Sequence, residues 1–177
     1  MILVFLLPLV SAGNNIVCVD LFYGSSCPHC HEETEFLSEL KQKYPELKVN
    51  LYEIYNNKEN AKLYTEIGNI YDISPALYNS KTVPVAFIGD KAFVGFDYGD
   101  TELYNQGYKT YIGYSGFIEK TIQECLESGC ICASESCDPN GECPDSFNYL
   151  LLAPIGIIIF IVGFILYKFR IRFKARV

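Results

Sequence analysis

Short apolar runs alternate with amphipathic segments along the first part of the chain, and this pattern predicts strands and helices in turn. Residues 16–23 are almost entirely apolar, which indicates a buried strand. Residues 28–43 follow a helical pattern that ends before Pro45, so we expect a helix there. Residues 47–54 alternate with a period of two, which predicts a second strand.

The pattern then predicts a helix, a hairpin and a last helix. Residues 57–71 look helical. Two strand-like runs, 83–88 and 92–96, flank a Gly-Asp-Lys turn, which is a hairpin signal. A final helix is expected at 117–126, stopped by Gly129. The order is therefore strand, helix, strand, helix, strand, strand, helix.

Three tyrosines, Tyr104, Tyr108 and Tyr111, recur at the spacing of successive helical turns. We expect them on a helix face packed against the domain, and the alternative is an aromatic stripe that faces a substrate.

Two cysteines stand between the first predicted strand and the first predicted helix, in the stretch Cys27-Pro28-His29-Cys30. Strand, turn, CxxC and helix together are typical of a redox-active dithiol. With Cys27 at the helix N-cap and Pro28 at the first helical position, free N–H groups and the helix dipole would stabilise a Cys27 thiolate, and His29 adds a donor or a positive charge. We expect Cys27 to exchange with substrate and Cys30 to resolve the mixed disulfide. The alternatives are a structural disulfide or half of a metal site, but no second CxxC is present to complete a zinc ribbon, and we predict no metal and no cofactor.

The element order, the CPHC motif and the Thr-Val-Pro that opens the hairpin resemble the thioredoxin-like superfamily over residues 16–128. The resemblance implies an α/β fold with a central mixed sheet flanked by helices. It also implies that Pro84 is cis and faces the CxxC, with Val83 beside it in a substrate-docking position. The Pro-His pair is similar to DsbA-type oxidases, but too few residues separate Cys30 from Pro84 for their helical insertion. The nearer likeness is to compact, membrane-anchored thioredoxin-like proteins.

The resemblance also suggests an acid for proton transfer. Thioredoxin-like proteins often carry a buried acid in the first strand that moves protons for the second cysteine, and Asp20 is the candidate. Asp20 lies one residue too far from Cys27, which places its side chain on the other sheet face unless Gly24, Ser25 and Ser26 absorb the shift. The alternative is a charge near the sheet edge. In the same strand we expect Cys18 to be a buried, inert thiol.

A second group of cysteines follows the last predicted helix, at Cys125, Cys130, Cys132, Cys137 and Cys143. Three interpretations are open: a disulfide-stapled stalk, which we favour, a second redox relay to the Cys27–Cys30 pair, or a metal site. With eight cysteines in 177 residues the chain suits an oxidising compartment.

Both ends of the chain are apolar. Residues 1–12 are interpreted as a signal peptide, because a short apolar run precedes Val10-Ser11-Ala12; the alternative is a buried N-terminal strand. Residues 150–167 contain no charge and predict a transmembrane helix at 149–167. The basic tail, 168–177, is then cytoplasmic by the positive-inside rule, and the catalytic domain is extracytoplasmic.

Charge agrees with this organisation and argues against one class of function. All 21 acidic residues precede residue 150, so the soluble part is strongly acidic, which disfavours nucleic-acid binding. The basic tail suits anionic lipid headgroups. The predicted domains are a thioredoxin-like domain at 14–128 and a Cys-rich linker at 129–148, followed by the membrane helix.

These observations predict a membrane-anchored thiol–disulfide oxidoreductase that acts on cysteines of secreted or membrane proteins. A membrane partner would reset its redox state, either a quinone-linked oxidase or a DsbD-like electron donor. The oxidase direction is favoured over a reductase or isomerase. The alternative from another class is a non-enzymatic metal-binding or adaptor module.

Overall fold

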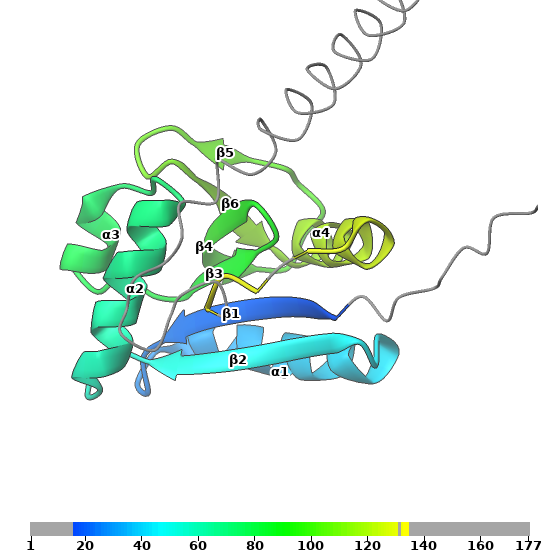
Figure 1. The fold of residues 1–177 in the computed structure, drawn as a ribbon, viewed down its shortest axis with the longest axis horizontal. Helices are drawn as coiled ribbons and strands as arrows, with labels where there is room; N and C mark the ends of the chain where they lie inside the picture. Colours follow the sequence, from blue (N-terminus) through cyan, green and yellow to red (C-terminus); the bar gives the residue numbers. More distant parts are fainter. Residues whose placement is uncertain (1–15, 131, 135–177) are drawn as a thin grey trace, which may run out of the picture. The chain divides into compact units, whose positions relative to one another are not determined.

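The computed structural model describes residues 16–130 and 132–134, which belong to the first of two units of the chain, Met1–Cys143. They form a six-stranded mixed sheet with the order β2-β1-β3-β4-β6-β5 (Figure 1). The strands are β1 (Val17–Tyr23), β2 (Leu47–Glu53), β3 (Val85–Ile88), β4 (Lys91–Asp97), β5 (Tyr104–Asn105) and β6 (Thr110–Tyr114). The helices are α1 (Pro28–Lys43), α2 (Lys58–Ile70), α3 (Pro75–Asn79) and α4 (Ser115–Ser128).

β1 pairs with one parallel and one antiparallel neighbour, which makes the sheet mixed. β1 runs parallel to β2, with Val19 opposite Val49, and antiparallel to β3, with Val19 opposite Ile88. The parallel pair is joined by α1, as a crossover connection requires. β3 and β4 form the expected hairpin. The mixed sheet with helices on both sides is consistent with the predicted thioredoxin-like α/β fold.

Alternation along β1 divides the core into two layers. Val19 and Leu21 pack with Leu37 of α1 and Ile118 of α4 on one face. On the opposite face, Phe22 packs in a cluster with side chains of α2 and α3. Successive strand residues point to opposite faces, so one strand serves both layers. Burial of each of these side chains stabilises the folded state by about 1.5–3 kcal/mol.

The helix boundaries follow local signals in the sequence. Cys27 is the N-cap of α1 and Pro28 its first residue, and Gly129, whose φ is 78°, is the C-cap of α4. Asn57 caps α2 by accepting the N–H groups of Glu59 and Asn60. The predicted helices at 28–43, 57–71 and 117–126 are therefore confirmed, with boundaries shifted by two residues or fewer.

The prediction that Tyr104, Tyr108 and Tyr111 share a helix face is wrong. They belong to the hairpin of β5 and β6, in which the rings of Tyr104 and Tyr111 meet with centroids 5.0 Å apart. Asn105 Oδ1 accepts the N–H groups of Gly107 and Tyr108, and this side-chain turn reverses the chain. The spacing of the three tyrosines therefore matches that of a helix, but the residues form a hairpin.

Some expectations concern parts of the chain outside the described residues. These are the signal peptide at 1–12, the transmembrane helix at 149–167, the basic tail at 168–177, and the cysteines Cys137 and Cys143. Within 16–130 and 132–134, none of the helices combines the length and the apolar character that crossing a membrane requires.

Candidate active site

The Cys27–Cys30 pair lies where β1 ends and α1 begins, and its two sulfurs are joined in a disulfide. A tight turn delivers Cys27 to this position, since its N–H donates to the carbonyl of Gly24 at 3.1 Å. The Cys27 backbone is extended, and its Sγ accepts the N–H of Cys30 at 3.1 Å. Cys27 therefore caps α1 with its own sulfur.

The two sulfurs differ in exposure and in electrostatic surroundings. Cys27 is half-buried, whereas Cys30 is 1% exposed. The Cys27 sulfur lies at the positive end of the α1 dipole, next to backbone N–H groups that have no partner within the helix. A thiolate at Cys27 would be stabilised by both, while a thiolate at Cys30 would be buried in the protein. An external thiol can thus reach Cys27 far more easily than Cys30.

The motif histidine is directed toward solvent. His29 Nδ1 lies 3.1 Å from Glu32 Oε2, and the two side chains are 68% and 49% exposed. His31 pairs in the same way with Glu35, at 3.3 Å. An exposed ion pair of this kind is worth at most about 1 kcal/mol. That His29 and Pro28 tune the Cys27 thiolate stays a prediction.

The loop before β3 faces the disulfide. The carbonyl oxygen of Val83 lies 3.9 Å from Cys27 Sγ, and the Val83–Pro84 peptide bond is cis, as the resemblance implied. Pro84 is buried, and its carbonyl accepts the N–H of Gly95 at 2.9 Å, which holds the loop against β4. The structure therefore places the Val83–Pro84 loop next to the Cys27 sulfur, and a substrate-docking role for these two residues stays a prediction.

Asp20 does not lie where a proton relay to Cys30 requires. Its neighbours Val19 and Leu21 pack on the α1 face, so Asp20 points to the α2 face. Its carboxylate accepts the side-chain N–H of Asn50 at 2.8 Å, and the N–H and hydroxyl of Ser134 at 2.9 and 2.7 Å. The one-residue offset from the CxxC is thus not absorbed by the loop. Asp20 is also no charge at a sheet edge, because it is fully buried on an interior strand.

Sequence reasoning missed a second buried acid, Glu33. It lies on the inward stripe of α1 with Cys30, Leu37 and Leu40 and is 1% exposed. Within the part of the chain that the structure describes, neither of its carboxyl oxygens has a hydrogen-bond partner. Burial raises the pKa of Glu33 from its ordinary value of 4.5 to about 8. The signal available in the sequence was the spacing of residues 30, 33, 37 and 40, which marks one helix face.

Cys18 is not an inert thiol, because it forms a disulfide with Cys132, 114 residues away in sequence. The bond lies beside the Asp20–Ser134 hydrogen bonds, so covalent and polar contacts together attach residues 132–134 to the α2 face of the sheet. The sequence pattern groups Cys132 with a separate cysteine cluster, because no local signal shows that the chain returns to β1.

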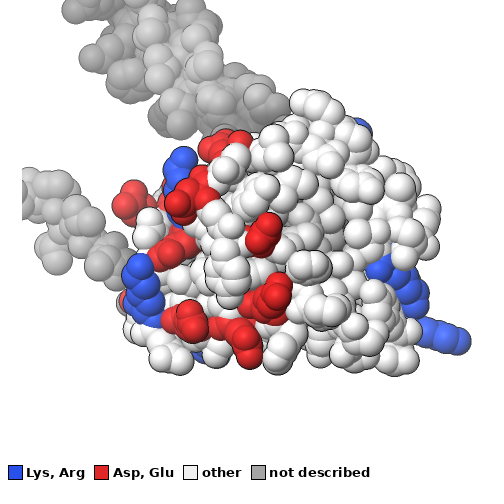
Figure 2. All heavy atoms as spheres, turned by 180° about the vertical axis from the view of Figure 1, so that it is seen from behind, with Lys and Arg blue, Asp and Glu red and all other residues white. Residues whose placement is uncertain are grey.

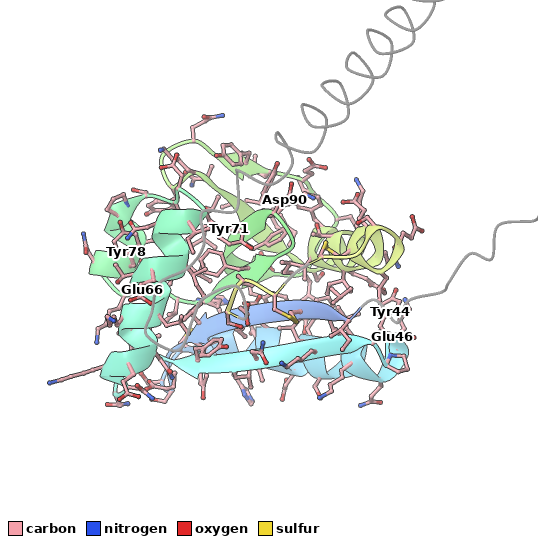
Figure 3. All side chains as sticks on the ribbon, viewed as in Figure 1. Tyr44, Glu46, Glu66, Tyr71, Tyr78 and Asp90 are labelled. Carbon is pink, nitrogen blue, oxygen red and sulfur yellow. A yellow bond between two sulfur atoms is a disulfide. The ribbon has the colours of Figure 1, made fainter. Side chains whose placement is uncertain are left out.

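The third disulfide joins Cys125 and Cys130 across the end of α4. It packs against the β3–β4 turn, where a Cβ on Gly89 would come within 2.8 Å of Cys125 Sγ. Tyr71 donates to the Gly89 carbonyl at 2.6 Å, and Figure 3 shows it close to the turn that carries Asp90.

This turn is at the opposite end of β1 from the CxxC. The register shows it: Phe22 pairs with Val85 near the CxxC, and Val19 pairs with Ile88 just before the turn. The separation is roughly the length of β1, on the order of 20 Å. Direct exchange between the Cys125–Cys130 disulfide and the CxxC would need much shorter distances, so the geometry favours a structural staple over a relay within one molecule.

The next two features are possible metal ligands and the charge on the surface. Among residues 16–130 and 132–134, no three or more His, Cys, Asp or Glu side chains are grouped so that they could hold a metal ion. Figure 2 shows one face, on which acidic side chains and a few basic ones are spread over one side, while the other side is largely uncharged apart from basic side chains at its edge.

Comparisons with known proteins do not identify the family of this chain. The chain matches no protein-family model and no curated protein sequence. Among solved structures it is similar to a glutaredoxin from Archaeoglobus fulgidus, with 26% identity over 45% of this chain and 75% of that chain, at a TM-score of 0.32. A likeness this partial assigns neither fold nor activity.

Proposed function

We propose that this chain is a thiol–disulfide oxidoreductase that exchanges its Cys27–Cys30 disulfide with cysteines of other proteins. The observation that supports this most is the asymmetry of the pair. Cys27 is half-exposed and caps α1 with its sulfur, whereas Cys30 is 1% exposed beneath it. A structural staple needs no such difference, while exchange through a mixed disulfide needs one reachable sulfur and one protected one.

The reaction has two exchange steps. A substrate thiolate attacks Cys27 Sγ, the Cys27–Cys30 bond breaks, and Cys30 leaves as a thiolate that takes up a proton. A second substrate thiolate then attacks the substrate sulfur of the mixed disulfide, and Cys27 leaves as a thiolate. The substrate loses two electrons and gains a disulfide, and the Cys27–Cys30 pair is reduced to two thiols. The reverse sequence reduces a substrate disulfide.

The oxidase direction is favoured by the position of Cys27. A thiolate stabilised at a helix N-terminus is a good leaving group, and its disulfide is correspondingly oxidising. Two further disulfides in the described residues suit an oxidising compartment. We propose cysteines of secreted or membrane proteins as substrates, with a quinone-linked oxidase or a DsbD-like donor in the membrane as redox partner. The segment 149–167 would anchor the chain in the lipid.

The test is transfer of the disulfide from the full chain, held in mild detergent, to a reduced dithiol peptide. We expect the wild type to oxidise the peptide and the Cys27→Ser variant to be inactive. The matched control is the double variant Cys125→Ser/Cys130→Ser, which also loses one disulfide but far from the site, and it should retain the transfer. Equal activity of the wild type and Cys27→Ser would refute the proposal.

A further inference from the structure

Lys81 has a backbone conformation that disfavours lysine. Its φ is 52°, in the left-handed region where glycine is usual and a residue with a Cβ is strained. Among the described residues, two others share this region without being glycine, Asp72 and Lys109. Aspartate tolerates the conformation better than lysine does, because its short polar side chain can bond the nearby backbone. A lysine in this position therefore calls for an explanation.

The left-handed residue ends α3. The Lys81 N–H donates to the carbonyl oxygen of Tyr78 at 3.2 Å. The N–H of Thr82 donates to the carbonyl oxygen of Leu77 at 2.8 Å. These two bonds form a Schellman motif, in which Lys81 occupies the position that glycine most often fills. The motif turns the chain from α3 into the loop that carries Val83. Both bonds use backbone groups only, so glycine at position 81 would keep them.

The side chain of Lys81 reaches the end of β2. Its Nζ donates to the carbonyl oxygen of Ile54 at 3.1 Å. The N–H of Ile54 in turn donates to the carbonyl oxygen of Tyr23 at 3.0 Å, which fixes this backbone to the end of β1, just before the CxxC loop. The side chain of Ile54 is fully buried, so the acceptor of the lysine is held by the core. Lys81 therefore joins the loop after α3 to the strand ends beside the CxxC.

The loop that Lys81 holds borders the reactive sulfur. The carbonyl oxygen of Val83, two residues further on, lies 3.9 Å from Cys27 Sγ. Between the two, the Thr82 carbonyl accepts the hydroxyl of Tyr64, a buried residue of α2, at 3.2 Å. Tyr64 thus holds the loop from the core, and the exposed Lys81 holds it from the surface. Loss of the lysine would leave the loop with one attachment fewer beside Cys27.

Lys109 offers a comparison within the same molecule. Its φ is 55°, close to that of Lys81, but its Nζ pairs with Asp72 Oδ2 at 2.8 Å, and the two side chains are 50% and 84% exposed. Lys109 lies in the β5–β6 hairpin, and the register of β6 with β4 places it near Lys91, at the end of the sheet away from the CxxC. The two lysines have the same backbone conformation, but of the two it is Lys81 that is tied to a segment beside Cys27.

We propose that Lys81 is a positioning residue for thiol–disulfide exchange at Cys27, an inference that rests on the proposed function. Its ammonium group ties the loop to the Ile54 carbonyl and so holds Val83 against the sulfur. A substrate thiolate attacks Cys27 Sγ on the side opposite Cys30, since the new S–S bond forms as the old one breaks. A fixed loop beside Cys27 limits the directions from which the substrate sulfur can approach, and this raises the fraction of productive encounters. The strained backbone is kept because glycine could not supply the tie.

The proposal separates the effect of Lys81 on the exchange rate from its effect on stability. Lys81→Gly removes the tie and the backbone strain together and keeps the Schellman bonds, so exchange should slow by roughly tenfold or more in a protein that stays folded. Lys81→Met keeps the strain and the length of the side chain but lacks the donor, so it should slow exchange in the same way. Lys81→Arg keeps a charged donor and should recover most of the wild-type rate.

The experiment measures the second-order rate constant for disulfide transfer from the oxidised full chain, in mild detergent, to a reduced dithiol peptide. Samples are quenched with acid and alkylated, and mass spectrometry follows the peptide that contains Cys27 and Cys30, which separates this disulfide from the others. The matched control is Lys109→Gly, which relieves the same backbone conformation away from the site. Urea unfolding gives the stability of each variant, and equilibration with glutathione gives the potential of its Cys27–Cys30 pair.

We expect the rate constant to fall roughly tenfold or more in Lys81→Gly and Lys81→Met and to keep its wild-type value in Lys109→Gly. Lys81→Gly should be no less stable than Lys109→Gly. The potential of the Cys27–Cys30 pair should be the same in all of these variants, because a positioning residue changes the rate of exchange and not its equilibrium.

Three results would overturn the role of Lys81 and leave the proposed function intact. The first is a rate constant of Lys81→Gly or Lys81→Met that equals that of the wild type. The second is a slow Lys81→Gly variant that is also less stable than Lys109→Gly, since its loss of rate would then follow from damage to the fold. The third is a shifted potential, which would assign Lys81 to tuning the Cys27 thiolate by its charge. If Cys27→Ser transfers disulfides as well as the wild type does, the proposed function fails instead, and the role of Lys81 fails with it.

Discussion

Replacing Glu33 with glutamine should remove a large part of the pH dependence of folding stability. In the folded protein the Glu33 carboxyl group is buried without a partner among the described residues, so its neutral form is favoured. In the unfolded chain the same group is in water and ionises at its ordinary pKa. Glutamine has nearly the same shape and cannot ionise, so the substitution isolates the effect of the proton.

The magnitude follows from the two pKa values. Burial raises the pKa of Glu33 from 4.5 to about 8, so between these pH values the folded state keeps a proton that the unfolded state has lost. The associated stability is fully present below about pH 4.5 and is lost as pH rises toward about 8, at about 1.4 kcal/mol per pH unit. At pH 7 the loss amounts to about 3 kcal/mol, a large share of the 5–15 kcal/mol that is usual for a folded domain. Glu33→Gln should escape this loss.

The assay is urea unfolding of the oxidised full chain in mild detergent, followed by circular dichroism at several pH values from about 4 to about 8.5. The quantity of interest is the difference in free energy of unfolding between Glu33→Gln and the wild type, in which the other titrating groups cancel. That difference should grow in favour of the variant by about 3 kcal/mol between pH 4.5 and pH 7. The exposed control Glu39→Gln should stay within about 0.5 kcal/mol of the wild type throughout. A difference for Glu33→Gln that does not change with pH would show that Glu33 ionises alike in both states and would refute the reasoning.

Three further outcomes follow from the site and the disulfide network. In the reduced protein, iodoacetamide at about pH 6 should modify Cys27 and leave Cys30 unmodified, because Cys27 is half-exposed at the helix N-terminus and Cys30 is buried. Equal labelling of the two cysteines in a peptide map would contradict this. The Cys30→Ser variant should accumulate mixed disulfides with disulfide-containing protein substrates, because Cys27 attacks the substrate disulfide, one substrate cysteine leaves as a thiolate, and no resolving thiol remains. These adducts would be visible as dithiothreitol-sensitive bands on a non-reducing gel, and their absence alongside an active wild type would be the opposing result. Asp20→Ala should lower the free energy of unfolding by about 3 kcal/mol, since it removes a fully buried acceptor and leaves the half-buried polar groups of Asn50 and Ser134 without it. A loss under about 0.5 kcal/mol in urea unfolding would contradict this.

The parts of the fold that depend on local pattern could be predicted from the sequence. The boundaries of α1 follow from an N-cap, a proline at the first helical position and an apolar stripe, all of which act within a few residues. The hairpin of β3 and β4 follows in the same way from a short polar turn between two apolar runs. For the same reason the residue pattern alone places the Cys27–Cys30 pair at the start of a helix.

The contacts that the sequence did not reveal are long-range or depend on which face a residue occupies. The Cys18–Cys132 disulfide and the Asp20–Ser134 hydrogen bonds both join residues 114 positions apart, and no local pattern encodes the return of the chain to β1. Glu33 is hard to recognise because charged residues surround it, which makes the segment look like an exposed helix face. Its burial follows from the rotation of α1 on the sheet.

The redox potential of the Cys27–Cys30 pair tests the central claim most directly. It can be measured in the full chain by equilibration with defined ratios of reduced and oxidised glutathione or dithiothreitol, followed by alkylation and mass spectrometry of the peptide that contains both cysteines. An exchange-active pair with its reactive sulfur at a helix N-terminus should have a potential between about −120 and −270 mV, the range of thioredoxin-like oxidoreductases. A potential below about −300 mV, as structural disulfides have, would show that the CxxC is a staple and would contradict the account.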